Sequence, residues 1–147
     1  MSDKFISRAK AWEDATNNGN VDALDEVYDQ NVVRHLPSAP DVVGLDTLKR
    51  GVLNNRLTSP DVKYTCEEML VDGDNTAFRF KIEGTNTGKI PDSPLTPTGK
   101  KWVLKGCNVA HTINGKVVEE WMYMDTLGMF QQLGYIPSNE EIFAQNS

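Results

Sequence analysis

The stretch of the chain best suited to chemistry places an acid among apolar and aromatic residues. It reads NGKVVEEWMYMDTLGMFQQLG and ends at Gly134. Its first two residues, Asn114 and Gly115, predict a tight hairpin turn, because both tolerate a positive φ. A strand over 117–125 should follow, and its alternation places one set of side chains on a common face: Val117, Glu119, Trp121, Tyr123 and Asp125. Removing a lone carboxylate from water costs free energy, so a carboxylate at position 125 indicates either a function or a compensating hydrogen bond.

Two roles are open to Asp125. A carboxyl group in apolar surroundings can accept and return a proton near neutral pH. Asp is also a favoured helix N-cap, and Asp125 stands directly before an expected helix over 126–133. In that position the carboxylate would accept a hydrogen bond from a free backbone N–H group and would favour the helix dipole.

Three further polar residues are candidates for the same site. Asn108, in an expected strand, could donate an amide hydrogen to a developing enolate oxygen, or could simply be a satisfied polar residue of the sheet. His35, beside a proline-containing loop, could be a second acid/base, a substrate contact or a structural residue. Arg79 would ordinarily face solvent, but an inward Arg79 paired with Asp125 would suggest epoxide hydrolysis.

Aromatic and other large side chains supply the expected pocket lining. The candidates are Tyr123, Trp121, Trp102, Phe80, Arg79, Met129 and Trp12. For the aromatic members, ordinary core packing is the alternative interpretation. Neither histidine, His35 or His111, has further ligands at metal-binding spacing, so neither a metal nor a cofactor is expected.

Composition narrows the class of protein. The chain has 147 residues and a net charge of −6, which disfavours nucleic acid and anionic membranes as partners. The only cysteines, Cys66 and Cys107, both fall in expected strands, which suggests buried thiols and a reducing, cytoplasmic location. No apolar run approaches the ~20 residues of a membrane span. We expect a hydrophobic small molecule to be the partner.

Periodicity predicts helices followed by strands. Helical spacing is expected over 2–17 with Ser2 as cap, and over 21–28, 45–57 and 126–133. Strands are expected over 31–36, 62–71, 76–87, 101–112 and 117–125, with irregular loops over 37–44 and 88–100. This order predicts an α+β fold in which the N-terminal helices pack against a strongly curved, mainly antiparallel sheet. The expected domain is a single one over 1–147, with a core over 1–134 and a tail over 135–147.

Three segments resemble one known family. GTNTG at 84–88, PTGKKW from Pro97 and the stretch from Asn114 to Gly134 are similar to the SnoaL-like polyketide cyclases of the nuclear transport factor 2-like superfamily. The resemblance implies a cone-shaped barrel with a deep apolar pocket, in a homodimer or a tetramer. It also implies that Asp125 is the general acid/base for an intramolecular aldol closure of a polyketide ester, without metal or cofactor.

The resemblance has two departures and leaves alternatives. Asn86 and Asn108 stand where such cyclases carry histidines. The leading hypothesis is a cyclase-type enzyme acting on an apolar carbonyl compound. A non-catalytic module that binds a hydrophobic small molecule is the second, and an epoxide hydrolase or isomerase is the third.

Overall fold

The computed structural model describes residues 3–146, so the predicted cap Ser2 lies outside the described residues. Helix α1 (Asp3–Glu13) continues as a π-helical turn, η1 (Asp14–Asn18), and a 3₁₀ helix, η2 (Val21–Glu26), follows. The other helices are α2 (Leu45–Thr58), α3 (Thr126–Leu133) and α4 (Asn139–Gln145). The helices expected before residue 134 are all present, and α4 adds a helix in the predicted tail.

Six strands form one sheet. They are β1 (Tyr28–Leu36), β2 (Ala39–Val43), β3 (Lys63–Asp72), β4 (Asn75–Thr85), β5 (Lys101–Ile113) and β6 (Lys116–Met124). Their order in the sheet is β2-β1-β6-β5-β4-β3, and within residues 3–146 only β1 and β6 pair in parallel. The sheet is therefore mainly antiparallel, as predicted, and it is not a closed barrel, since β2 and β3 remain as edges.

Strand β2 corrects the predicted loop over 37–44. Pro40 and its neighbours suggested irregular backbone, but Ala39–Val43 pairs with β1. Proline is tolerated there because β2 is an edge strand, so one N–H group fewer removes no bond from the interior of the sheet.

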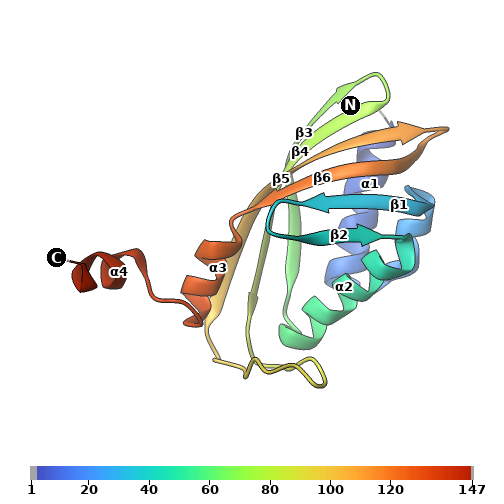
Figure 1. Cartoon of the computed structure of the whole chain (residues 1–147). Helices are drawn as coiled ribbons and strands as arrows, with labels where there is room; N and C mark the ends of the chain where they lie inside the picture. Colours follow the sequence, from blue (N-terminus) through green and yellow to red (C-terminus); the bar gives the residue numbers. More distant parts are fainter. Residues whose placement is uncertain (1–2, 147) are drawn as a thin grey trace.

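The sheet curves around the helices (Figure 1), with α1 and α2 on its inner face. Along β4 the side chains of Phe78 and Phe80 are buried on this face, whereas Arg79 is exposed. A first hydrophobic cluster gathers around Trp12 and Phe80, and a second around Trp102 and Leu133 nearer to α3. The predicted α+β architecture and the alternation of β4 are confirmed.

A bulge in the β5–β6 hairpin changes which side chains of β6 face inward. His111 pairs with Glu119 and the next residue of β5, Thr112, pairs with Val117, so Val118 has no partner across the ladder. The extra residue shifts the alternation by one position. Val117 is buried, but beyond the bulge the buried positions are Glu120 and Met122.

This bulge overturns the predicted face of β6. Trp121, Tyr123 and Asp125 were expected to share a buried face with Val117. Tyr123 is instead 54% exposed, and Asp125 is exposed as well. Regular alternation counted from Val117 therefore gives the wrong side of the sheet for the end of the strand.

The remaining segments agree with the sequence in outline. Residues 86–100 form the predicted irregular loop, and α4 projects away from the body of the molecule (Figure 1). Cys66 and Cys107 are free thiols, although both are only partly buried. Between residues 3 and 146, the structure contains no helix with the length and apolar character needed to cross a membrane.

Candidate functional site

A cavity of about 360 Å³ lies between the inner face of the sheet and the helices α1, α2 and α3. Its walls are mainly apolar, and they include Trp12, Leu48, Val52, Phe78, Phe80, Ile82, Trp102, Leu104, Met122, Met124, Met129 and Phe130. This volume and lining are typical of sites for small organic ligands.

The predicted lining residues divide between two sides of the sheet. Trp12, Phe80, Trp102 and Met129 line the cavity. The other three candidates, Trp121, Tyr123 and Arg79, are not among its lining residues. Tyr123 and Trp121 are on the outer face because of the β6 bulge.

Asp125 is the N-cap of α3. Its Oδ1 accepts a hydrogen bond of 3.0 Å from the backbone N–H of Gly128, and the side chain is exposed. The residues on either side of it, Met124 and Thr126, line the cavity, whereas Asp125 does not. The cap role considered from the sequence is present, and an acid/base role for Asp125 stays a prediction of the family resemblance.

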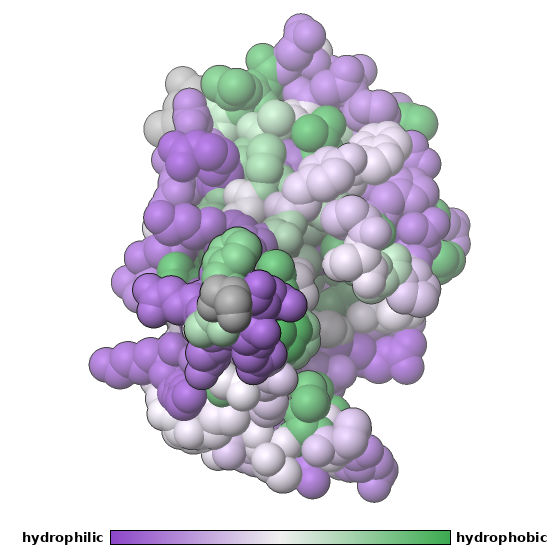
Figure 2. Space-filling model, turned by 60° about the vertical axis from the view of Figure 1, so that its left-hand side comes forward, coloured by the Kyte–Doolittle hydropathy of each residue, from purple (hydrophilic) through white to green (hydrophobic). Residues whose placement is uncertain are grey.

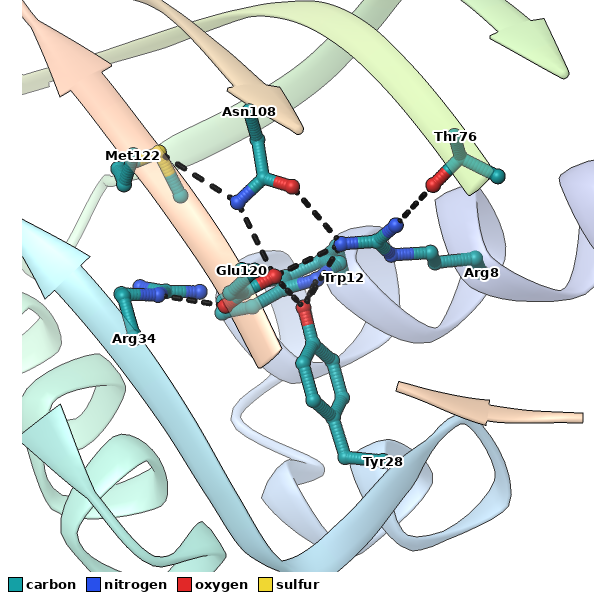
Figure 3. A network of polar contacts seen from close by, with 8 residues as sticks. All are labelled: Arg8, Trp12, Tyr28, Arg34, Thr76, Asn108, Glu120 and Met122. Carbon is teal, nitrogen blue, oxygen red and sulfur yellow. Dashed lines mark hydrogen bonds and ion pairs between the residues drawn. The ribbon is translucent and has the colours of Figure 1, made fainter. Parts of the chain in front are cut away.

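A buried carboxylate, Glu120, is the centre of a polar network beside the cavity (Figure 3). Its Oε2 accepts hydrogen bonds from Arg8 Nη2 at 2.8 Å and Tyr28 Oη at 2.9 Å. Its Oε1 accepts one from Arg34 Nε at 2.6 Å. The network joins α1, β1 and β6, which are far apart along the chain.

Asn108 belongs to this network and does not line the cavity. It is fully buried; its Nδ2 donates to Glu120 Oε2 at 3.0 Å, and its Oδ1 accepts from Arg8 Nη2 at 3.0 Å. Both ends of its amide group are bonded within the network, as expected for a satisfied polar residue of the sheet, and an approach to a substrate oxygen stays a prediction.

The network contains more positive than negative charge. Burial opposes ionisation of Glu120, but the charges of Arg34 and Arg8 outweigh this effect and hold the pKa of Glu120 below its usual value. Glu120 is thus ionised at neutral pH, and both guanidinium groups are charged. One buried carboxylate balances only one of the two buried cations, which leaves one positive charge beside the cavity.

Two hydrogen-bond donors of cavity-lining residues have no partner among the described residues: Arg34 Nη2 and Tyr64 Oη. Both residues line the cavity, and both contact Trp12, with the guanidinium carbon of Arg34 5.0 Å and the ring of Tyr64 5.9 Å from its ring. Burial raises the pKa of Tyr64, so its hydroxyl group stays protonated and able to donate. Both atoms are covered in this structure, so a small shift of either side chain would let a ligand oxygen in the cavity accept a hydrogen bond from it.

His35 and Arg79 lie outside the cavity. His35 stands between Asp41 and Glu119, at 3.0 Å and 3.3 Å, and these hydrogen bonds raise its pKa. Arg79 pairs with carboxylates of β3, at 2.9 Å from Glu68. His35 is thus not among the residues that line the cavity, and Arg79 pairs with carboxylates of β3 and not with Asp125.

Sequence reasoning missed Arg8, Arg34, Tyr64 and Glu120. A weak signal existed for Arg8, which stands one helical turn before Trp12 and so shares the inner stripe of α1. Charged residues in amphipathic elements usually face solvent, so the sequence offered no comparable signal for Glu120. Within the described chain no three His, Cys, Asp or Glu side chains are placed to hold a metal ion.

The comparisons with known proteins agree with this architecture. The family model described as SnoaL-like polyketide cyclase matches residues 7–133. The chain belongs to this family. No curated protein matches the chain.

Solved structures share the family's nuclear transport factor 2-like fold. TsrD from Streptomyces laurentii superposes with a TM-score of 0.78 at 20% identity, covering 92% of this chain and 99% of TsrD. IdmH from Streptomyces antibioticus, a proposed polyketide cyclase, gives 0.71 at 24% identity, covering 90% of this chain and 99% of IdmH. A proposed polyketide cyclase from Bacillus cereus gives 0.72 at 25% identity, covering 90% of this chain and 82% of the other.

The network predicts a pH-dependent stability. Because the folded-state pKa of Glu120 is lowered, its contribution is present above the unfolded-state value of about 4.3 and is lost as pH falls through the lower folded-state value. We expect Glu120→Gln to lower the free energy of unfolding by about 3–5 kcal/mol at pH 7, since two buried cations lose their partner. Urea unfolding of both proteins between pH 7 and pH 3 should show this difference shrinking. An equal difference at both ends would contradict an ionised Glu120.

The cap of α3 makes a second prediction. Asp125→Ala should lower the free energy of unfolding by about 1 kcal/mol, because the Gly128 N–H loses its acceptor. Asp125→Asn should change it by only a few tenths of a kcal/mol, because Asn caps equally well. Thermal or urea unfolding measures both. Equal stability of Asp125→Ala and wild type would show that the cap contributes nothing.

Proposed function

We propose that the protein is a cofactor-independent enzyme of the polyketide cyclase type, which binds an apolar carbonyl compound in the cavity and closes a ring by an aldol-type reaction. The observation that carries this proposal is that two residues lining a mainly apolar cavity, Arg34 and Tyr64, each have a buried donor atom without a partner, Nη2 and Oη. Membership of the SnoaL-like family supports the class of reaction.

The chemistry of an aldol closure fits these donors. Transfer of a proton from carbon to a base, which the proposal takes to be Asp125, gives an enolate. Attack of that carbon on a second carbonyl group forms the carbon–carbon bond and an alkoxide, which takes the proton back from the base. Each species carries negative charge on an oxygen atom. Donors fixed in a water-poor site stabilise such oxygens, and one donor of this kind is typically worth about 10²–10³ in kcat.

The electrostatics favour the same species. The unbalanced positive charge of the Arg8, Arg34 and Glu120 group lies beside the cavity, where Arg34 reaches the lining. A developing oxyanion next to Arg34 would bring this buried charge into balance. Glu120 acts in this proposal as a positioning residue, since its Oε1 accepts a hydrogen bond from Arg34 Nε and so holds the guanidinium group in place.

Proton transfer by Asp125 remains part of the proposal through the family resemblance, and one variant tests it. Asp125→Asn retains the cap but lacks the carboxylate. Loss of turnover with unchanged stability would support an acid/base role, and unchanged turnover would contradict it.

A non-catalytic binding module is the second candidate. One observation favours it, because the described residues that line the cavity include no carboxylate and no histidine. Such a module would use Arg34 and Tyr64 to hold a carbonyl or acidic oxygen of an apolar ligand. Binding without turnover across a panel of carbonyl substrates would support it over the enzyme.

We also propose that the protein is a homodimer built on the outer face of the sheet. Tyr123 and Val109 are exposed there, at 54% and 36%, next to Trp121. Figure 2 looks onto this side, where hydrophobic and weakly polar side chains run between hydrophilic margins. Apolar surface of this kind marks sites of protein association.

The oxyanion proposal predicts that Tyr64→Phe separates function from stability. The variant removes a hydroxyl group without a partner, so the free energy of unfolding should stay equal or rise by about 1 kcal/mol. Turnover of an apolar diketone or keto ester should fall by about 10². Tyr28→Phe is the matched control, because its hydroxyl bonds Glu120 and Trp12, and its loss should lower stability. Unchanged kcat and binding in Tyr64→Phe would refute the role of its hydroxyl.

The dimer proposal predicts that Val109→Arg is monomeric, because a charge would be buried at the contact. Leu70→Arg is the matched control, since Leu70 is also exposed, at 65%, but lies near the β3–β4 turn. Sedimentation equilibrium at micromolar concentrations measures the mass of both variants. A monomeric wild type would contradict the proposal.

A further inference from the structure

A second, smaller cavity of about 130 Å³ lies beneath the loop over 86–100. Loop residues Ile90, Ser93 and Leu95 form one side of it, and Leu133 of α3 and Tyr135 contribute to the other. Pockets that hold a whole drug-sized ligand usually exceed about 300 Å³. This chamber can therefore accept only part of a ligand.

The two cavities share a wall. Asn55, Trp102, Met129 and Phe130 line both of them. The chamber thus lies against the α3 end of the main cavity, on the other side of Trp102, Met129 and Phe130. Arg34 and Tyr64 lie elsewhere in the main cavity, beside Trp12 of the first hydrophobic cluster. A ligand with its oxygen at Arg34 and Tyr64 would extend past Trp102 toward the loop.

The loop that covers the chamber is held at both ends. Gly88 N donates to the Thr58 carbonyl at 2.9 Å, and Thr98 N donates to Asn86 Oδ1 at 2.7 Å. Tyr135 Oη donates to the Thr96 carbonyl at 2.6 Å. These bonds fix the chamber before any ligand enters, so filling it costs little ordering of the chain.

Gly88 is needed for this close approach. A Cβ atom at position 88 would overlap the backbone carbonyl of Leu57 at the end of α2. The loop can therefore lie against α2 only with glycine at this position. The GTNTG segment thus has a structural part in building the chamber.

We propose that the chamber is a subsite for an apolar tail, so that the ligand class is an elongated molecule with an acidic or enolisable oxygen at one end and an alkyl or aryl extension at the other. The proposal rests on the proposed function for the position of the oxygen. Apolar side chains of Ile90, Leu95, Leu133 and Phe130 supply the surface that the tail would cover. Ile90 and Leu95 then set the permitted length of the tail.

Binding of 4-alkylbenzoates to the full chain, measured by isothermal titration calorimetry, tests the subsite. Each methylene group that enters an apolar site tightens binding by about fourfold. We expect 4-hexylbenzoate to bind at least about tenfold more tightly than 4-ethylbenzoate. Ile90→Trp fills the chamber and should reduce this preference to less than about threefold, with 4-ethylbenzoate bound as by wild type.

Thr96→Trp is the matched control, because Thr96 is on the same loop but is exposed and does not line the chamber. It should keep the wild-type preference for the longer tail. Thermal unfolding shows whether Ile90→Trp alters the fold. If it does, Leu95→Trp is the second variant that fills the chamber. If the filling variants keep the wild-type ratio, the tail binds elsewhere and the proposal is overturned.

The uncharged 4-hexylbenzamide separates this inference from the proposed function. Tighter binding of the benzoate than of the benzamide supports an anion-stabilising end at Arg34 and Tyr64. If the benzoate and the benzamide bind equally and Ile90→Trp still abolishes the preference for the longer tail, the oxyanion site is refuted and the tail subsite is supported. If the benzoate binds more tightly than the benzamide but the longer tail gives no tighter binding, the oxyanion site is supported and the tail subsite is refuted.

Discussion

The buried group of Arg8, Glu120 and Arg34 is the interaction on which the rest of the structure depends. It ties the first helix to β1 and β6, and Asn108 and Thr76 connect it to β5 and β4. Removing any one of these three charged groups would leave a buried charge without its partner, which is strongly destabilising. The network therefore specifies how α1 sits on the sheet, and with it the position of Trp12 at the inner end of the cavity.

The same network accounts for the chemistry available in the cavity. A neutral pair would leave an apolar cavity with no preference for charge. Two guanidinium groups beside one carboxylate leave a net positive charge that attracts an anion. Arg34 is the group that can bind the anion, because its Nη2 has no hydrogen-bond partner and Glu120 is bound by its Nε. Stability and the proposed function thus depend on one set of side chains, which fits the common finding that functional sites break the local rules that specify the fold.

The sequence predicted most of the fold and only part of the site, for identifiable reasons. The hydrophobic period and the turn residues predicted the helices before residue 134 and five strands, and the NG turn predicted the last hairpin. Strand β2 was predicted as a loop because it contains Pro40, which an edge strand tolerates and an interior strand excludes. Trp12, Phe80, Trp102 and Met129 were found because large apolar residues line both core and cavity. Arg8, Arg34 and Glu120 were missed, because a charge normally indicates solvent and its burial depends on partners that only the tertiary structure brings together.

The bulge at Val118 has a consequence for comparing relatives. One unpaired residue decides whether the side chains after it look into the cavity or away from it. Two homologues could carry the same WMYMD motif at the same distance from the turn and still present opposite halves of it to their substrates. Roles are therefore better transferred between members of this family by position on the ladder than by position in an alignment. Insertion or loss of a single residue in this hairpin would be a short evolutionary route to a different set of reacting groups on an unchanged scaffold.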